Sequence, residues 1–220
     1  MKYSNLLESC KLCKRNCGVN RLKGELGFCK ASDKVKIARA SLHFWEEPPI
    51  SAENGSGTVF FSHCNLHCVF CQNHDISQEF NGEYISIKRL SEIFLELQEK
   101  GANNINLVTP THYIPQIKEA LDIAKANGLT LPILYNTNTY DSLDAIKELD
   151  GYIDVYLPDF KYFNNKYAVK YSSAPYYLEN IMPVLKEMVS QNGIVDYATW
   201  YKISDVYVGV TRIAELRKYI

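Results

Sequence analysis

The sequence predicts an α/β fold with a parallel sheet, because short β-rich runs alternate with amphipathic helices through the middle of the chain. Alternation at this spacing is typical of βαβ units, whose crossovers are right-handed. No internal repeat or low-complexity tract interrupts the pattern. The expected strands are 58–61, 105–109, 132–136 and 153–157.

The helices between these strands are recognised by apolar residues that recur every three or four positions. Segment 86–101 begins at Ser86, a suitable N-cap, and 113–128 has the same apolar pattern. A shorter helix is expected over 141–151. Active groups in such folds gather beyond the carboxyl ends of the strands. The segments in which we expect site residues are therefore 62–73, 109–113, 136–140 and 158–162.

The composition indicates one domain with an appendage, since the chain has 220 residues and 46% of them are hydrophobic. There are 24 Lys and Arg against 25 Asp and Glu, so the basic footprint of a nucleic-acid binder is missing and no nucleic-acid partner is expected. We see no secretory signal and no apolar run of about 20 residues. A cytoplasmic protein without a membrane span is the expectation.

The seven cysteines all precede residue 72, and seven is an odd number. Clustered cysteines in a chain without an export signal indicate metal ligation rather than disulfides. Three of them follow the first expected strand, in "CNLHCVFCQN" (64–73), with C-x3-C-x2-C spacing. Three thiolates can hold a 4Fe–4S cluster with one open iron, while His74 would complete a zinc set. The strand context favours the cluster. We expect His63, His67 and His74 to be solvated or neighbouring residues rather than ligands.

A second set of cysteines lies near the amino terminus, where "GVNR" and "GELG" supply turns. Its spacing is C-x2-C-x3-C-x11-C, formed by Cys10, Cys13, Cys17 and Cys29. Four thiolates suit either zinc or a closed 4Fe–4S cluster, and the spacing does not choose between them. The segment that follows, "HFWEEP" (43–48), is expected to pack against the sheet, and "SAENGSG" (51–57) to be a flexible linker.

The C-x3-C-x-aromatic-C motif after a first strand resembles the radical S-adenosylmethionine (radical SAM) superfamily. Together with "CKLCKRNCGVNRLKGELGFC", "LHFWEEPPI" and "GSGTVFFSHC", it is similar to radical SAM proteins related to pyruvate formate-lyase activating enzyme. The resemblance implies an incomplete (β/α) TIM-like barrel and a 4Fe–4S cluster held by Cys64, Cys68 and Cys71. It also implies an oxidoreductase in which SAM binds the fourth iron and is cleaved to a 5′-deoxyadenosyl radical, as in glycyl-radical enzyme activation.

The same resemblance assigns residues to SAM. Phe70 occupies the position of an aromatic residue that stacks on adenine, and Asp159 and Lys161 match an Asp-x-Lys motif that contacts SAM. Asn136 replaces an Asp of a monovalent-cation site, which leaves that site in doubt. The full set of expected SAM-binding residues is Phe70, Gln72, Thr109, Thr111, His112, Asn138, Asp159 and Lys161. The implied partners are a glycyl-radical enzyme as protein substrate and an electron donor such as flavodoxin or ferredoxin.

We therefore expect three parts: a cysteine-rich metal- or cluster-binding segment (1–52), a radical SAM partial barrel (53–193) and a divergent tail (194–220). The tail does not match the continuation of the relatives, although "DVYVGV" suits a fifth strand, so the last barrel units are expected to be shortened. Two alternatives remain at this point. One is a shortened, catalytically impaired cluster-binding protein, and the other is a zinc-stabilised module without catalysis.

Overall fold

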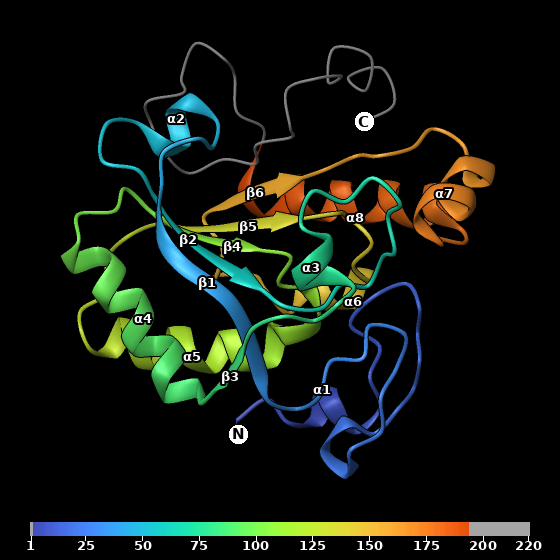
Figure 1. Ribbon diagram of the computed structural model, residues 1–220, viewed down its shortest axis with the longest axis horizontal. Coiled ribbons are helices and arrows are strands. Elements are labelled where there is room, and N and C mark those ends of the chain that lie inside the picture. Colours follow the sequence, from blue (N-terminus) through green and yellow to red (C-terminus); the bar gives the residue numbers. More distant parts are fainter. Residues whose placement is uncertain (1, 194–220) are drawn as a thin grey trace.

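A computed structural model describes residues 2–193 and contains a six-stranded sheet with strand order β3-β1-β2-β4-β5-β6 (Figure 1). Neighbouring strands from β2 to β6 run parallel, whereas β1 is antiparallel to both β2 and β3. The strands are β1 (Val35–His43), β2 (Ser56–Phe61), β3 (Glu83–Ile85), β4 (Ile105–Val108), β5 (Ile133–Thr137) and β6 (Val155–Pro158). The predicted α/β class is confirmed, and an open sheet of this kind agrees with an incomplete barrel.

Three of the main helices each lead into a parallel strand, and the fourth follows β6. They are α4 (Ile87–Glu99), α5 (Ile114–Ala126), α6 (Leu143–Lys147) and α8 (Tyr177–Asn192). The Ser86 hydroxyl caps α4 by accepting a hydrogen bond from the Arg89 amide at 3.0 Å, as the sequence predicts. The predicted helix over 141–151 is shorter, because Ser142 is the N-cap of α6. The remaining pieces are α1 (Asn5–Glu8), η1 (Arg21–Lys23), α2 (Pro48–Ser51), α3 (His74–Ser77), η2 (Thr111–Tyr113) and α7 (Asn165–Ser172).

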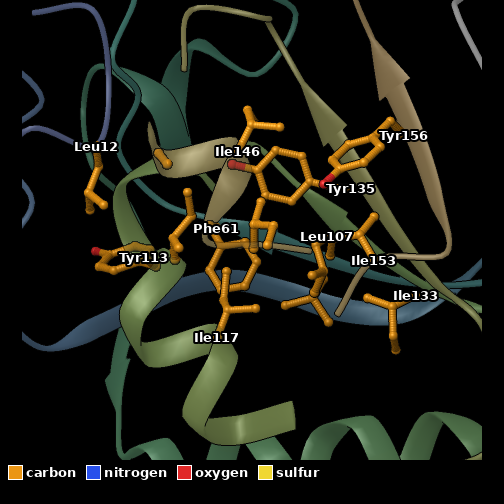
Figure 2. Packing of buried hydrophobic residues seen from close by; sticks show 14 of the residues in the cluster. Leu12, Phe61, Leu107, Tyr113, Ile117, Ile133, Tyr135, Ile146, Ile153 and Tyr156 are labelled. Atoms are coloured by element: carbon orange, nitrogen blue, oxygen red, sulfur yellow. The ribbon is translucent and has the colours of Figure 1, made fainter. Parts of the chain in front are cut away.

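The core fills the space between the sheet and these helices (Figure 2). Strand side chains such as Phe61, Leu107 and Tyr135 are at most 1% exposed and pack with Ile117 of α5 and Ile146 of α6. Side chains alternate across a strand, so Asn106 and the other intervening residues face the opposite side of the sheet. Among residues 2–193, that opposite side carries a small apolar cluster of Ile50, Leu134 and Leu157.

The amino-terminal segment contributes β1, a strand that sequence analysis missed. It runs along β2 in Figure 1, with Leu42 opposite Gly57 and His43 opposite Ser56. The prediction of a flexible linker over 51–57 is wrong at both ends, because Ser51 belongs to α2 and the last two residues belong to β2. Gly57 is needed for close packing, because a Cβ there would lie 2.7 Å from the Asn104 carbonyl oxygen.

The expected carboxyl-terminal strand and helix lie outside the described residues. Across residues 2–193, each helix is too short or too polar to cross a bilayer.

Candidate functional site

The three-cysteine loop begins where β2 ends, at the carboxyl edge of the parallel strands, and continues into α3 (Figure 1). Two backbone hydrogen bonds tie it to α7: the His67 amide donates to the Ser172 carbonyl at 3.1 Å, and the Val69 amide donates to the Tyr171 carbonyl at 2.9 Å. Cys64 and Cys68 are buried and Cys71 is partly buried, all as free thiols. The loop is therefore held against α7.

Each of the three sulfur atoms has a polar neighbour. The Ser172 hydroxyl donates to Cys68 Sγ at 2.8 Å, and Asn138 Nδ2 donates to Cys64 Sγ at 3.5 Å. Cys71 Sγ lies 3.3 Å from the hydroxyl of Ser77. Burial raises the pKa of the Cys64 thiol to about 12, so this group needs a bound cation to become a thiolate at neutral pH.

The three thiols open into a cavity of about 560 Å³ on the side of the sheet opposite α4 and α5. Its walls come from the ends of all four parallel strands, as expected for this fold class. Six of the expected SAM-binding residues line the same cavity: Phe70, Gln72, Thr109, Asn138, Asp159 and Lys161. Asn136 also lines it.

Asp159 and Lys161 form an ion pair at the cavity wall. Burial by itself lowers the pKa of the Lys161 ammonium, but the attraction of the Asp159 carboxylate and the hydrogen bond to it prevail, and the pKa is raised. Lys161 is thus positively charged at neutral pH. The Asp159 side chain is 55% exposed, which leaves a carboxylate facing the open space.

Two expected SAM-binding residues, Thr111 and His112, are not among the residues that line this cavity. Thr109 has a left-handed backbone (φ +58) that turns the chain, and Thr111 begins the 3-10 turn η2. His112 Nε2 lies 2.8 Å from the Ser62 carbonyl oxygen, and burial lowers the pKa of the imidazole to about 3. Both side chains face the amino-terminal cysteines instead, where they line a space of about 20 Å³.

Several cavity residues were missed by sequence analysis. The prediction that "HFWEEP" packs against the sheet is wrong for Trp45, which is 89% exposed at the cavity. Glu46 also lines the cavity, and its Oε2 accepts a hydrogen bond from Asn106 at 3.0 Å. Ser172 lies 104 positions from Cys68, so no local pattern could connect the two. Glu46 carried a weak signal as an acidic residue beside an exposed tryptophan.

The three histidines near the loop have different surroundings. His63 is buried, with Nδ1 3.0 Å from the Cys29 carbonyl oxygen, and its ring stacks on Phe80. His67 packs against Phe28. His74 lies at the surface, where its Nδ1 is 3.6 Å from Glu79. His74 is therefore not positioned as a fourth zinc ligand beside Cys71.

The donor set fits an iron–sulfur cluster with one free position. Over residues 2–193, no three or more His, Cys, Asp or Glu side chains are arranged to hold a single metal ion. A tetrahedral zinc ion would bring its thiolate sulfurs to about 3.8 Å from one another. In a 4Fe–4S cluster each thiolate binds a different iron, so the sulfurs stay farther apart. The three thiols share one wall of an open cavity, and the space beyond them is large enough for a small molecule.

Comparison with known proteins supports the same interpretation. An uncharacterized protein of Methanocaldococcus jannaschii is 32% identical in an alignment of 186 residues that covers 80% of this chain and 52% of that protein. The chain thus spans about half the length of this curated relative. The model of the radical SAM superfamily matches residues 58–211, a range that starts in β2 and includes the three-cysteine loop and all the parallel strands. The chain belongs to the radical SAM superfamily.

Proposed function

We propose that this chain cleaves SAM reductively and removes hydrogen from a protein substrate, in the manner of glycyl-radical enzyme activases. Membership of the superfamily implies a 4Fe–4S cluster and SAM as cofactors. When bound, the reduced cluster supplies one electron to SAM, whose sulfonium–C5′ bond breaks to give methionine and a 5′-deoxyadenosyl radical. That radical takes a hydrogen atom from the substrate and becomes 5′-deoxyadenosine.

The observation that carries this proposal is the single cavity that contains the three thiols and a separate set of SAM-type contacts. The Lys161 ammonium offers a partner for the methionine carboxylate, and the Asp159 carboxylate offers one for the cationic part of SAM. Phe70 is 55% exposed and available to stack on an adenine ring. These groups bind and orient SAM, while the cofactors carry the bond cleavage.

The substrate enters, in this proposal, from the side of Trp45 and Glu46. Both residues line the same cavity as Cys64, so a substrate that touches them also reaches the reaction centre. An exposed tryptophan beside a carboxylate suits recognition of a peptide segment. A glycyl-radical enzyme is therefore our proposed protein substrate. Flavodoxin or ferredoxin is the proposed electron donor, in the reducing environment of the cytoplasm.

The test of SAM cleavage uses the whole chain, purified and reconstituted without oxygen. Dithionite plus SAM should release 5′-deoxyadenosine, and Cys64→Ala, Cys68→Ala or Cys71→Ala should abolish the release. Cluster-containing protein that binds SAM but releases no 5′-deoxyadenosine would favour a catalytically impaired protein. Folded protein that binds zinc but no iron at these cysteines would favour a structural module.

The activase type needs its own test. A candidate glycyl-radical enzyme is added to the reduced protein with SAM, and the sample is examined by electron paramagnetic resonance. A glycyl-radical doublet that requires Cys68 supports the activase proposal. SAM cleavage without a doublet for any candidate partner would retain the radical SAM chemistry and reject this substrate class.

A further inference from the structure

We propose that Cys10, Cys13, Cys17 and Cys29 bind a metal as a closed tetrathiolate centre, and that Arg15 and Arg21 balance its negative charge. The centre is separate from the three-cysteine site and offers no free position to a small molecule. Its metal is either one zinc ion or a 4Fe–4S cluster, which share this ligand chemistry.

The backbone brings the four cysteines together. The Cys10 amide donates to the Val19 carbonyl at 2.9 Å and the Gly18 amide donates back to Cys10 at 2.9 Å, which folds the segment into a tight turn. Gly27 approaches Cys17 so closely that a Cβ there would lie 2.9 Å from its Sγ. All four cysteines line one small space of about 20 Å³, next to the two arginines, Thr111 and His112.

The burial of Arg21 is the first observation that indicates negative charge in this space. Its side chain is only 1% exposed, and its hydrogen bonds go to neutral groups: Nη1 donates to the His112 carbonyl at 2.6 Å, and Nη2 donates to the Ser32 carbonyl. Within residues 2–193 no carboxylate forms an ion pair with it. A buried guanidinium without a counter-charge is strongly unfavourable. The nearby groups that can become anionic are thiols, and Nη1 lies 3.9 Å from Cys10 Sγ.

Arg15 adds a second cation on another side of the same space. Its guanidinium carbon lies 3.5 Å from the centre of the Phe28 ring, and its Nε donates to the Asn65 carbonyl at 3.1 Å. No described carboxylate pairs with Arg15 either. Four thiolates carry four negative charges, of which zinc or an oxidised 4Fe–4S core offsets two. The two arginines offset the remaining two.

Unpartnered polar atoms gather around the same space. Buried side-chain nitrogen and oxygen atoms nearly always have a hydrogen-bond partner in native proteins. Among the described residues, two N–H donors without one line this space: Arg15 Nη2 and Arg21 Nε. Arginine N–H donors beside four sulfurs are the expected surroundings of thiolates, whose sulfur atoms accept such hydrogen bonds.

The two metals require different sulfur positions. The described residues contain no group of three or more ligands arranged for one ion, so zinc binding requires the cysteine side chains to rotate inward. A cluster takes thiolates that are farther apart, but it needs more room than about 20 Å³. Elemental analysis therefore has to decide between them.

The first experiment uses the full chain with Cys64→Ala, Cys68→Ala and Cys71→Ala combined, which leaves only the amino-terminal cysteines. Anaerobic protein is treated with zinc alone, or with ferrous iron and sulfide. We expect about one zinc, or about four irons and four sulfides, per chain. Binding should release protons from the thiols, and X-ray absorption should give an all-sulfur shell near about 2.3 Å for zinc. Folded protein that binds neither metal overturns the proposal.

The second experiment tests the charge balance. Arg21→Met and Arg15→Met should each speed metal loss to a chelator at least tenfold, while Arg21→Lys should restore part of the retention. The control is Arg39→Met, because Arg39 is exposed and its Nε donates to the Ser41 hydroxyl, away from both cysteine sets. If Arg21→Met does not fold, the rate of metal loss from Arg15→Met still tests whether an arginine stabilises the metal centre. Metal loss at the control rate from every folded arginine variant rejects the role of the arginines.

Discussion

The two cysteine sets of this chain lie close together but have opposite surroundings. The three-cysteine loop opens into about 560 Å³, and its sulfurs contact neutral hydroxyl and amide groups. The four-cysteine segment encloses about 20 Å³ and is bordered by two arginines. The set with three thiols has the large cavity, and the set with four thiols has the small one. Where one ligand position is free, the protein also leaves room for a cofactor.

Two contacts join the sets. Arg15 Nε donates to the Asn65 carbonyl, one residue after Cys64, at 3.1 Å. His63 Nδ1, one residue before Cys64, lies 3.0 Å from the Cys29 carbonyl oxygen. The closed set is therefore placed against the backbone of the open one. From this arrangement we expect the two sets to have separate roles: the closed set supports the loop, and the open set takes part in the reaction.

The largest expected effect separates reaction from support. Cys68→Ala should remove the cluster of the loop and abolish 5′-deoxyadenosine formation, because three thiolates are the minimum set for the site. Cys17→Ala should lower thermal stability yet leave part of the SAM cleavage per folded molecule, since a lost structural metal weakens folding. Iron content, melting and product formation measure the difference. If Cys68→Ala and Cys17→Ala lose the same amount of SAM cleavage per folded molecule, the two sets do not have separate roles.

The open side is tested next through SAM affinity. Asp159→Asn and Lys161→Met should each weaken SAM binding about tenfold to a hundredfold, because a hydrogen bond to a charged group contributes about 1.5–3 kcal/mol. Iron content should stay unchanged in both. Lys166→Met is the control, since Lys166 is exposed on α7 and lies outside the cavity. Unchanged dissociation constants would place SAM elsewhere.

The closed side is tested through pH. Burial lowers the pKa of His112 to about 3, so the folded protein keeps this imidazole neutral. Its contribution to stability is fully present above the unfolded pKa of about 6.5 and is lost as pH falls towards 3. Between pH 7.5 and 5 the loss is about 2 kcal/mol. The His112→Asn variant should be less stable than the original protein at pH 7.5. Its free energy of unfolding, measured with denaturant, should fall by about 2 kcal/mol less between pH 7.5 and 5. If the free energies of unfolding of the variant and the original protein change equally with pH, His112 is not a buried neutral histidine.

The smallest effect concerns the hydrogen bond on the open side. Ser172 donates to Cys68 Sγ, and a donor to a thiolate stabilises the more negative, reduced cluster. Ser172→Ala should therefore lower the reduction potential by about 20–60 mV, the equivalent of about 0.5–1.5 kcal/mol for one electron. Ser91→Ala is the control, because that hydroxyl donates to Lys88 on α4. A potential equal to that of the control would show that Ser172 does not contact the thiolate.

Local sequence determined the four parallel strands, the helices α4 and α5 and the three-cysteine loop, whereas α8 was not predicted. Periods of two and about 3.6 residues, the Ser86 cap and the C-x3-C-x2-C spacing all lie within short windows. The position of site residues after each strand follows from the carboxyl-edge rule for parallel sheets, which placed Thr109, Asn138, Asp159 and Lys161 at the cavity.

Tertiary structure alone decided the rest. Only the antiparallel pairing of β1 with β2 brings Trp45 and Glu46 to the cavity, and only α7 brings Ser172 to Cys68. The η2 turn directs Thr111 and His112 to the closed cysteines, although they follow the same strand as Thr109. Contacts between segments far apart in sequence depend on how whole elements pack. The apolar pattern of a segment shows which of its faces is buried, but not which distant residue it contacts.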